Sequence, residues 1–347
     1  MRVERKSGAL PILLDDEDEE ILAVSSFATA LRARGSSPNT IVSYVYDLRR
    51  LYEFLRRASL TIEELTPADG LEFLVYLRAL QVRRGAGRAL ADSSINRMLA
   101  ATSTFYAYLV LSDWPGVTQN PFQMSSGGPL HYAHPRRSRR WMRVPRTQRL
   151  PRPLAEDQVT HLLTACTCRR DVALILLMLQ GGMRIGEVLN IQLRDIEYGR
   201  RRIWVRFRND HPRGARTKSR SERVVDLLEP ETLPAVNAYV VHERPRVETE
   251  QQHVFLTGGA GRTAGQPLAY DAAAKWFSRL KDAAGLGGTP LTIHCLRHTH
   301  ATRMWEGGMS ELTLQKRLGH ASFESTRMYT QVTDEAMLAD YRKALRL

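Results

Sequence analysis

The protein has 347 residues, of which 43% are hydrophobic and 25% are charged, and a mass of 39.4 kDa. At about 100–200 residues per domain, this length predicts two globular domains. No uncharged apolar run reaches the roughly 18 residues of a membrane-spanning helix, which excludes an integral membrane protein of that type. Three cysteines cannot form a disulfide framework, so we expect a reduced, cytoplasmic protein.

The net charge of +13, with an isoelectric point near 10.0, favours a polyanionic partner, with nucleic acid first and an anionic membrane surface second. The excess is densest in residues 121–153, which hold eight arginines and no acidic residue. Such a segment is typical of a strap along a phosphate backbone, although a solvated linker is the alternative. The candidates for backbone contacts in this segment are Arg136, Arg137, Arg139 and Arg140.

The N-terminal part of the chain is predicted to be helical. Residues 1–20 form an acidic tail with seven acidic and three basic side chains. Residues 21–120 show helical periodicity, with start signals at Ser37-Pro38, at Thr66-Pro67 and at Asp92 or Ser93, and predict a bundle of about four helices. Residues 121–153 are rich in proline and form an Arg-rich linker between the two domains.

The second domain spans residues 154–347. Helices are expected over 156–165 and 170–180 and again after Leu268, whereas 202–207 and 222–227 alternate with period two and predict paired strands. The expected fold class is therefore mainly α with a small β-sheet: a helical first domain followed by a mixed α+β domain.

Four segments of the second domain carry candidate functional groups. Arg184 lies between two predicted helices, and Lys218 lies in the basic loop between the predicted strands. A zinc site at His294, His298 and His300 is disfavoured because it lacks the glutamate of an HExxH motif. Arg297, which shares the helical face of His294, would also repel a dication. The last segment has Leu318-Gly319-His320 followed nine residues later by Tyr329.

These groups together fit one mechanism. Two guanidiniums can hold the non-bridging oxygens of a phosphodiester and stabilise its pentacoordinate transition state. A lysine can protonate a leaving alkoxide, a histidine can accept a proton, and a tyrosine can form a phosphate ester. This chemistry requires no metal ion, no organic cofactor and no ATP.

The ordered motifs resemble those of the tyrosine recombinase (phage integrase) family. Gly182 to Leu189 resembles its first arginine box, His294 to Thr302 its His-x-x-Arg box, and Leu318 to Thr330 its terminal box with the nine-residue gap. Lys218 stands where the family's hairpin lysine is expected, and residues 21–120 are similar to the family's core-binding domain. Two positions depart from the family pattern: His300 stands where an apolar residue is usual, and Gly186 replaces a small polar one.

The resemblance implies a role for each matched residue. Tyr329 attacks the scissile phosphate and becomes linked to its 3′ side, Arg184 and Arg297 clamp the phosphate, and Lys218 is the acid for the leaving 5′-hydroxyl. His294 acts in proton transfer and His320 bonds a phosphate oxygen. Glu187 and His298 are expected to support this set of residues. Arg216 and Arg220, in the basic loop, are expected to contact DNA.

The resemblance therefore implies a site-specific DNA recombinase that acts on double-stranded DNA as a homo-tetramer, through a Holliday junction, in the nucleoid. Residues 332–347 are predicted to form an amphipathic helix that docks on a neighbouring protomer, or packs on its own domain. Two alternatives remain: a type IB topoisomerase-like enzyme that nicks and reseals alone, and a catalytically silent DNA-binding regulator.

Overall fold

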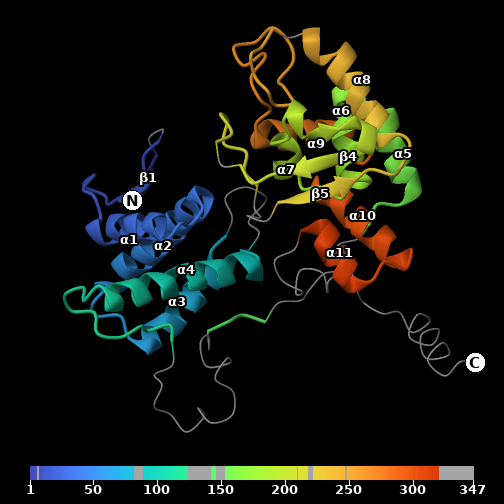
Figure 1. Ribbon diagram of the computed structural model, residues 1–347. Coiled ribbons are helices and arrows are strands. Elements are labelled where there is room, and N and C mark those ends of the chain that lie inside the picture. The colour runs from blue at the N-terminus through green and yellow to red at the C-terminus, as the bar shows by residue number, and fades with distance from the viewer. Residues whose placement is uncertain are drawn as a thin grey trace, which may run out of the picture. The chain divides into compact units, whose positions relative to one another are not determined.

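The computed structural model describes residues 1–5, 8–81, 89–123, 142–145, 153–208, 210–217, 222–246 and 248–319. The chain divides into two compact units, residues 1–148 and residues 149–347. The described residues are mainly α-helical with two small β-sheets, which confirms the predicted class of a mainly α fold with little sheet (Figure 1). None of the helices in the described residues is long and apolar enough to cross a bilayer.

The first unit is built on helices that begin where local capping signals occur. Ser37 accepts a hydrogen bond from the Thr40 backbone N–H, and Thr66 forms a capping box with Asp69, so each fixes a helix start. The elements of this unit are β1 (Arg2–Glu4), β2 (Ile12–Leu14), α1 (Leu22–Ala33), α2 (Pro38–Ala58), α3 (Pro67–Ala79) and α4 (Asp92–Leu111).

Aromatic side chains fill the core of the first unit. Phe27 and Phe105 meet edge to face with ring centroids 5.4 Å apart. Tyr106 is buried as well, and its hydroxyl donates to the Ile62 carbonyl at 2.9 Å, so its polar end is satisfied. Burial of each large side chain contributes about 1.5–3 kcal/mol, so this apolar core stabilises the bundle.

Two parts of the first unit were not anticipated from the sequence. Residues 1–20, expected as an acidic tail, contain the antiparallel pair β1–β2, in which Val3 pairs with Leu13. Residues 142–145, expected within the linker, pack on the bundle because Val144 exchanges hydrogen bonds of 2.9 and 3.0 Å with the Asn96 side chain. Both differences arise from apolar residues that find buried positions on the helices.

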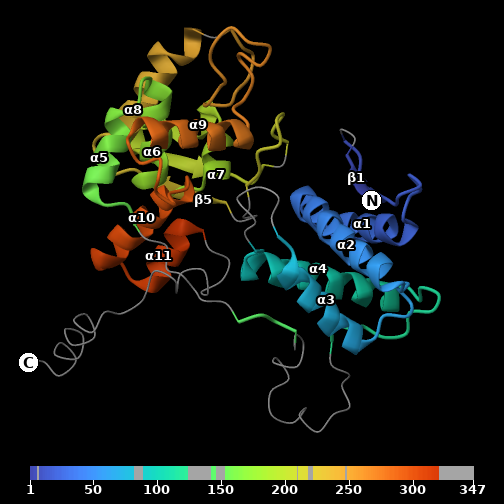
Figure 2. The same cartoon turned by 180° about the vertical axis from the view of Figure 1, so that it is seen from behind.

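The second unit surrounds the buried helix α6, in which every residue from Ala173 to Leu179 is buried. Helices α8 and α10 pack against α6, and α11 lies beside α10 (Figures 1 and 2). The helices of this unit are α5 (Glu156–Thr164), α6 (Arg169–Leu179), α7 (Ile185–Leu189), α8 (Thr232–His242), α9 (Tyr270–Ala283), α10 (His294–Glu306) and α11 (Glu311–Leu318).

The sheet of the second unit is antiparallel in the order β3-β4-β5. Its register pairs Ile203 with Val225, both fully buried, so the apolar face of the strands turns toward the core. The predicted strand pair is therefore present, and a short third strand joins it. The remaining elements are β3 (Ile196–Glu197), β4 (Arg202–Val205), β5 (Arg223–Asp226) and the 3₁₀ turns η2 (Leu193–Asp195), η3 (Tyr198–Arg200) and η4 (Arg244–Arg246).

Candidate active site

Three guanidiniums of the second unit surround one buried carboxylate, that of Glu187 on α7. Arg184, directly before α7, donates from its backbone N–H to Glu187 Oε2 at 2.9 Å and from its guanidinium to Oε1 at 2.8 Å. Arg223, the first residue of β5, donates to both carboxylate oxygens, at 3.0 and 2.8 Å. Arg297 on α10 places Nη1 3.7 Å from Oε2. We call these four residues the arginine cluster.

The arginine cluster keeps its carboxylate ionised although Glu187 is only 2% exposed. Burial, the largest influence, would raise the pKa of Glu187, but the hydrogen bonds from Arg223 and the charges of the three guanidiniums together outweigh it and lower that pKa to about 2. Three positive groups and one negative group leave a net charge of +2. An anion with two negative charges is the natural complement of this arrangement.

Arg184 and Arg297 also converge on the backbone at the end of α11. The guanidinium of Arg297 donates to the Leu318 carbonyl at 2.6 Å and to the Gly182 carbonyl at 2.7 Å. That of Arg184 reaches the carbonyls of Leu318 and Gly319 at 3.3–3.4 Å. The structure therefore brings together two residues that are predicted to bind one phosphate, on the turn that directly precedes His320.

The histidines on α10 have different surroundings. His294, the first residue of α10, is exposed, and its Nε2 lies 3.4 Å from the Tyr270 hydroxyl. His298 is partly buried, and burial together with the charges of His294 and Arg297 lowers its pKa to about 4. His298 is therefore neutral near pH 7, in keeping with a supporting role beside Arg297.

His300, one of the two positions that depart from the family pattern, is buried on α10 and contacts both α6 and α11. Its Nδ1 lies 3.1 Å from the Leu179 carbonyl, which fixes the proton there, and Nε2 accepts from Arg317 Nε at 3.0 Å. Burial, followed by the charge of Arg317, lowers the pKa of His300 to about 3. Both ring nitrogens are thus occupied, and His300 is unsuited to the zinc site considered above.

The loop between β4 and β5 is fastened to the body of the unit. Arg208 donates to both carboxylate oxygens of Asp195, at 2.7 and 2.9 Å. The Thr217 hydroxyl accepts from the Arg208 N–H at 3.1 Å and donates to the Arg208 carbonyl at 3.2 Å. A Cβ atom at Gly186 would lie 2.3 Å from the Arg216 carbonyl oxygen. The loop therefore packs tightly on α7, which explains the second departure from the family pattern.

Several predicted residues lie outside the described part of the chain: Lys218, Arg220, His320, Tyr329 and the linker arginines Arg136, Arg137, Arg139 and Arg140. Arg216 is described and partly buried. Within the described residues, the sequence analysis missed Arg223 and Arg317. A usable signal for Arg223 was its alternation with Val225 and Leu227, which places a charged residue on the apolar face of the predicted strand.

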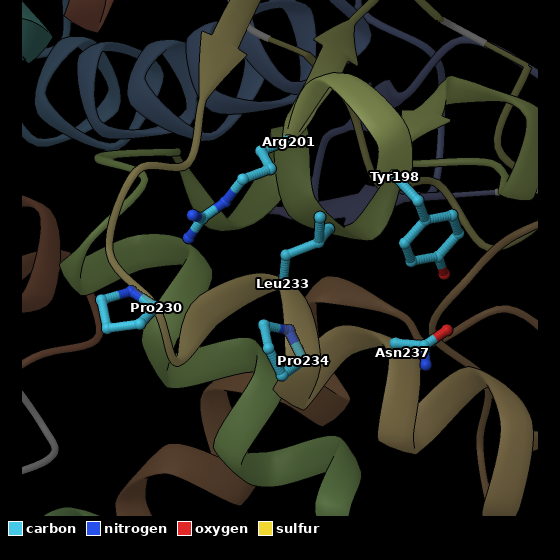
Figure 3. Close-up of a pocket in the computed structure, with 6 residues that line it drawn as sticks. All are labelled: Tyr198, Arg201, Pro230, Leu233, Pro234 and Asn237. Atoms are coloured by element: carbon cyan, nitrogen blue, oxygen red, sulfur yellow. The ribbon is translucent and has the colours of Figure 1, made fainter.

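A separate cavity of about 420 Å³ lies between η3 and the start of α8 (Figure 3). None of its lining residues is a predicted site residue or a member of the arginine cluster, so we give it no part in the chemistry. The lining residues are Tyr198, Arg201, Pro230, Leu233, Pro234 and Asn237. Among the described residues, no group of three or more His, Cys, Asp or Glu side chains could hold a metal ion.

Two family models match the chain: the phage integrase family over residues 152–336 and the phage integrase N-terminal SAM-like domain over residues 24–112. The first covers more than half of the chain, so the protein belongs to the phage integrase family of tyrosine recombinases. It is an enzyme that cleaves and rejoins DNA.

Individual relatives agree with this assignment. Transposase A from transposon Tn554 of Staphylococcus aureus is 31% identical over 359 aligned residues, covering 99% of this chain and 97% of the relative. Tyrosine recombinase XerD of Halalkalibacterium halodurans is 29% identical, covering 88% of this chain and 90% of the relative.

Solved structures share the fold. The Tn1549 transposon integrase in complex with transposon right end DNA matches with a TM-score of 0.69 at 20% identity, over 94% of this chain and 99% of that chain. The XerH recombinase bound to palindromic difH substrate matches with a TM-score of 0.61 at 18% identity, over 92% and 83% of the two chains.

Proposed function

We propose that this tyrosine recombinase is a site-specific enzyme of the transposase or integrase type, which moves DNA between defined sites through a 3′-phosphotyrosyl intermediate and a Holliday junction. The transposase assignment rests on the 31% identity with Tn554 transposase A over nearly the whole length of both chains. Double-stranded DNA is the partner, since solved structures of the same fold are complexes with DNA.

One observation carries the assignment of the site: Arg184 and Arg297 converge on the Leu318–Gly319 turn with Glu187 ionised between them. The two guanidiniums bind the non-bridging oxygens of the scissile phosphate, and the net charge of +2 stabilises the extra negative charge of the pentacoordinate transition state. His320, the next residue along the chain, donates a further hydrogen bond to the phosphate.

Proton transfer completes the proposed reaction. The Tyr329 oxygen forms a bond to phosphorus as its proton passes to His294, and the 5′-oxygen leaves with a proton from Lys218. The bond to the 5′-oxygen breaks as the phosphotyrosyl bond forms, so the energy of the phosphodiester is conserved and the reverse reaction rejoins the strand. The exposure of His294 beside Tyr270 supports this role, because a DNA substrate can reach it.

Four protomers would exchange strands in pairs, with residues 332–347 of each docked on a neighbour, in the nucleoid of the cytoplasm. The linker arginines and the basic loop residues Arg216 and Arg220 would contact phosphates rather than bases. The test is truncation after residue 331. The truncated chain should bind one DNA half-site with unchanged affinity and fail to form tetramers on a full site; formation of normal tetramers would refute the docking proposal.

The first experiment traps the covalent intermediate. The wild type and Tyr329→Phe are incubated in EDTA with nicked fragments of the DNA that flanks the gene, quenched with detergent, and the attached DNA is sequenced. We expect adducts at one position for the wild type and none for the variant, with equal DNA binding by both.

The trapping assay and a separate relaxation assay distinguish the alternatives. A topoisomerase-like enzyme would form adducts at many positions in the first, and in the second it would relax supercoiled DNA without recombined product. A silent DNA-binding regulator would form no adduct on the flanking DNA or on a random-sequence library, and this result would refute the proposed function.

A further inference from the structure

Arg223 connects two parts of the site that are far apart in the sequence, Glu187 on α7 and the end of α11 at Arg317. It is the first residue of β5 and lies five residues after Lys218 along the chain. Its side chain is only 8% exposed. Alternation along the strand places Arg223 on the same face as Val225, which is fully buried, so this guanidinium is held inside the unit.

Every nitrogen of the Arg223 guanidinium has a defined partner. Nη1 and Nη2 donate to the two oxygens of Glu187, and Nε donates to the Arg317 carbonyl at 2.9 Å. Gly319 packs directly on the guanidinium, because a Cβ atom there would lie 2.8 Å from Nη1. Gly319 also has φ of +63°, so a side chain at this position would be strained as well as crowded.

We propose that Arg223 is a positioning residue for DNA cleavage, acting through Glu187 and the Arg317–Gly319 turn. This inference rests on the proposed binding of the scissile phosphate by Arg184 and Arg297. Arg223 engages both oxygens of Glu187, which leaves the other two guanidiniums only partly committed to the carboxylate. Without Arg223, the Glu187 charge would draw Arg184 and Arg297 toward itself and away from the phosphate.

The planar fork of arginine is essential to this role. A lysine at position 223 keeps the positive charge but has one nitrogen, so it cannot bond both Glu187 oxygens and the Arg317 carbonyl in one plane. Arg223→Lys therefore loosens both Glu187 and the turn that precedes His320. Misplacement of catalytic groups by about 1 Å can cost about 100-fold in rate, so the defect should appear in cleavage rather than in DNA affinity.

The experiment measures single-turnover adduct formation on the nicked duplex that the wild type attacks in the trapping assay, together with DNA affinity and thermal melting. Arg223→Lys should lower the rate constant about 10- to 100-fold, with the dissociation constant within about twofold of wild type. The matched control is Arg202→Lys, because Arg202 lies on the neighbouring strand β4 and pairs with a carboxylate, Asp226, at 3.2 Å. This control should cleave within about twofold of wild type.

A double-variant cycle tests whether Arg223 acts through Glu187. Glu187→Gln should also slow cleavage about tenfold or more. The rate constant of the double variant should then lie within about threefold of that of the slower single variant. Losses that multiply would overturn the proposal, as would normal cleavage by Arg223→Lys. So would a rate that falls only in step with DNA binding and the folded fraction.

Two results separate this inference from the proposed function. If the wild type forms no adduct through Tyr329, both are refuted; if it does and Arg223→Lys cleaves normally, only the role of Arg223 is refuted. Should Arg223→Lys fail to fold, Glu187→Gln decides alone, because normal cleavage by that variant would show that no positioning passes through the carboxylate.

Discussion

The two units of the protein each bury a carboxylate, and the two carboxylates have opposite ionisation properties. Asp47 of the first unit is 1% exposed, and Glu187 of the second is 2% exposed. Burial raises the pKa of Asp47 to about 7, against a smaller lowering effect of Arg97. Burial also acts to raise the pKa of Glu187, yet the surrounding guanidiniums lower it to about 2.

The difference lies in the number and burial of the positive partners. Among the described residues, Asp47 has one ion-pair partner, Arg97 at 2.8 Å, whose side chain is 46% exposed and therefore largely screened by water. Glu187 has the three guanidiniums of the arginine cluster, whose side chains are 6–20% exposed. A helical bundle tolerates a carboxyl that becomes neutral, whereas a site that binds phosphate needs a permanent counter-charge to hold its arginines in place.

The two carboxyls therefore give opposite dependences of stability on pH. Folding favours the protonated form of Asp47, so its contribution is full below pH 3.8 and is lost as the pH rises through about 7. Folding favours the ionised form of Glu187, so its contribution is full above pH 4.5 and is lost as the pH falls through about 2.

The largest expected effect is that of Glu187→Ala, which would leave three guanidiniums without their common carboxylate. We expect a loss of about 3–5 kcal/mol from the free energy of unfolding of the second unit, and loss of DNA cleavage. Urea denaturation followed by tryptophan fluorescence measures the first. Glu156→Ala is the control, because Glu156 is 83% exposed and pairs with Arg303, and it should cost less than about 1 kcal/mol. Equal losses of stability in the two variants would show that the buried carboxylate of Glu187 contributes no more than an exposed one.

Asp47→Asn tests the other half of the comparison. The amide cannot ionise, so the stability of the variant relative to wild type should increase between pH 4 and pH 8, by up to about 4 kcal/mol for a shift of roughly three pKa units. Urea denaturation at each pH gives the difference. Asp69→Asn is the control, because in the wild type hydrogen bonds from Thr66 lower the pKa of the Asp69 carboxyl. The difference in free energy of unfolding between this variant and the wild type should not change between pH 5 and pH 8. A flat profile for Asp47→Asn would contradict the raised pKa.

The sequence predicts those features whose cause is local. The helix starts at Ser37 and Thr66 follow from side chains that cap the next turn, and the strands β4 and β5 follow from alternation of apolar residues. The family assignment follows from ordered motifs, and among the described residues the predicted phosphate-binding residues Arg184 and Arg297 lie in one cluster. The roles of all predicted site residues remain predictions.

Features that depend on distant partners could not be predicted. His300 donates to the carbonyl of Leu179, 121 residues earlier in the chain, and Arg223 donates to Glu187, 36 residues earlier. Neither partner can be deduced from spacing, because only the packed unit brings them together. Gly186 was noted only as a departure from the family pattern, since its close neighbour, the Arg216 carbonyl, belongs to a loop 30 residues away.

Gly182→Ala should sharpen the contrast between crowded and open glycines of the second unit. Gly182 has φ of +62°, and a Cβ atom there would lie 2.4 Å from Cδ2 of His300. We expect the free energy of unfolding to fall by about 2–3 kcal/mol, because the backbone is strained and His300 is displaced. Gly214→Ala is the matched control, because φ is +73° but nothing lies within 4 Å, so only the backbone cost of about 1 kcal/mol applies. Similar losses for both variants in urea denaturation would show that His300 moves aside freely.

Thr217→Val should have the smallest effect on stability and a distinct effect on cleavage. The substitution removes both hydrogen bonds between the Thr217 hydroxyl and the Arg208 backbone, at a cost of about 1 kcal/mol. Because Lys218 is the next residue, we also expect adduct formation to slow about tenfold. In the control Thr249→Val, the hydroxyl makes an equivalent pair of bonds, to Gly265 and Gln251, in a different loop. The control should lose similar stability and cleave normally; equal cleavage by the two variants would show that the fastening of the β4–β5 loop does not position Lys218.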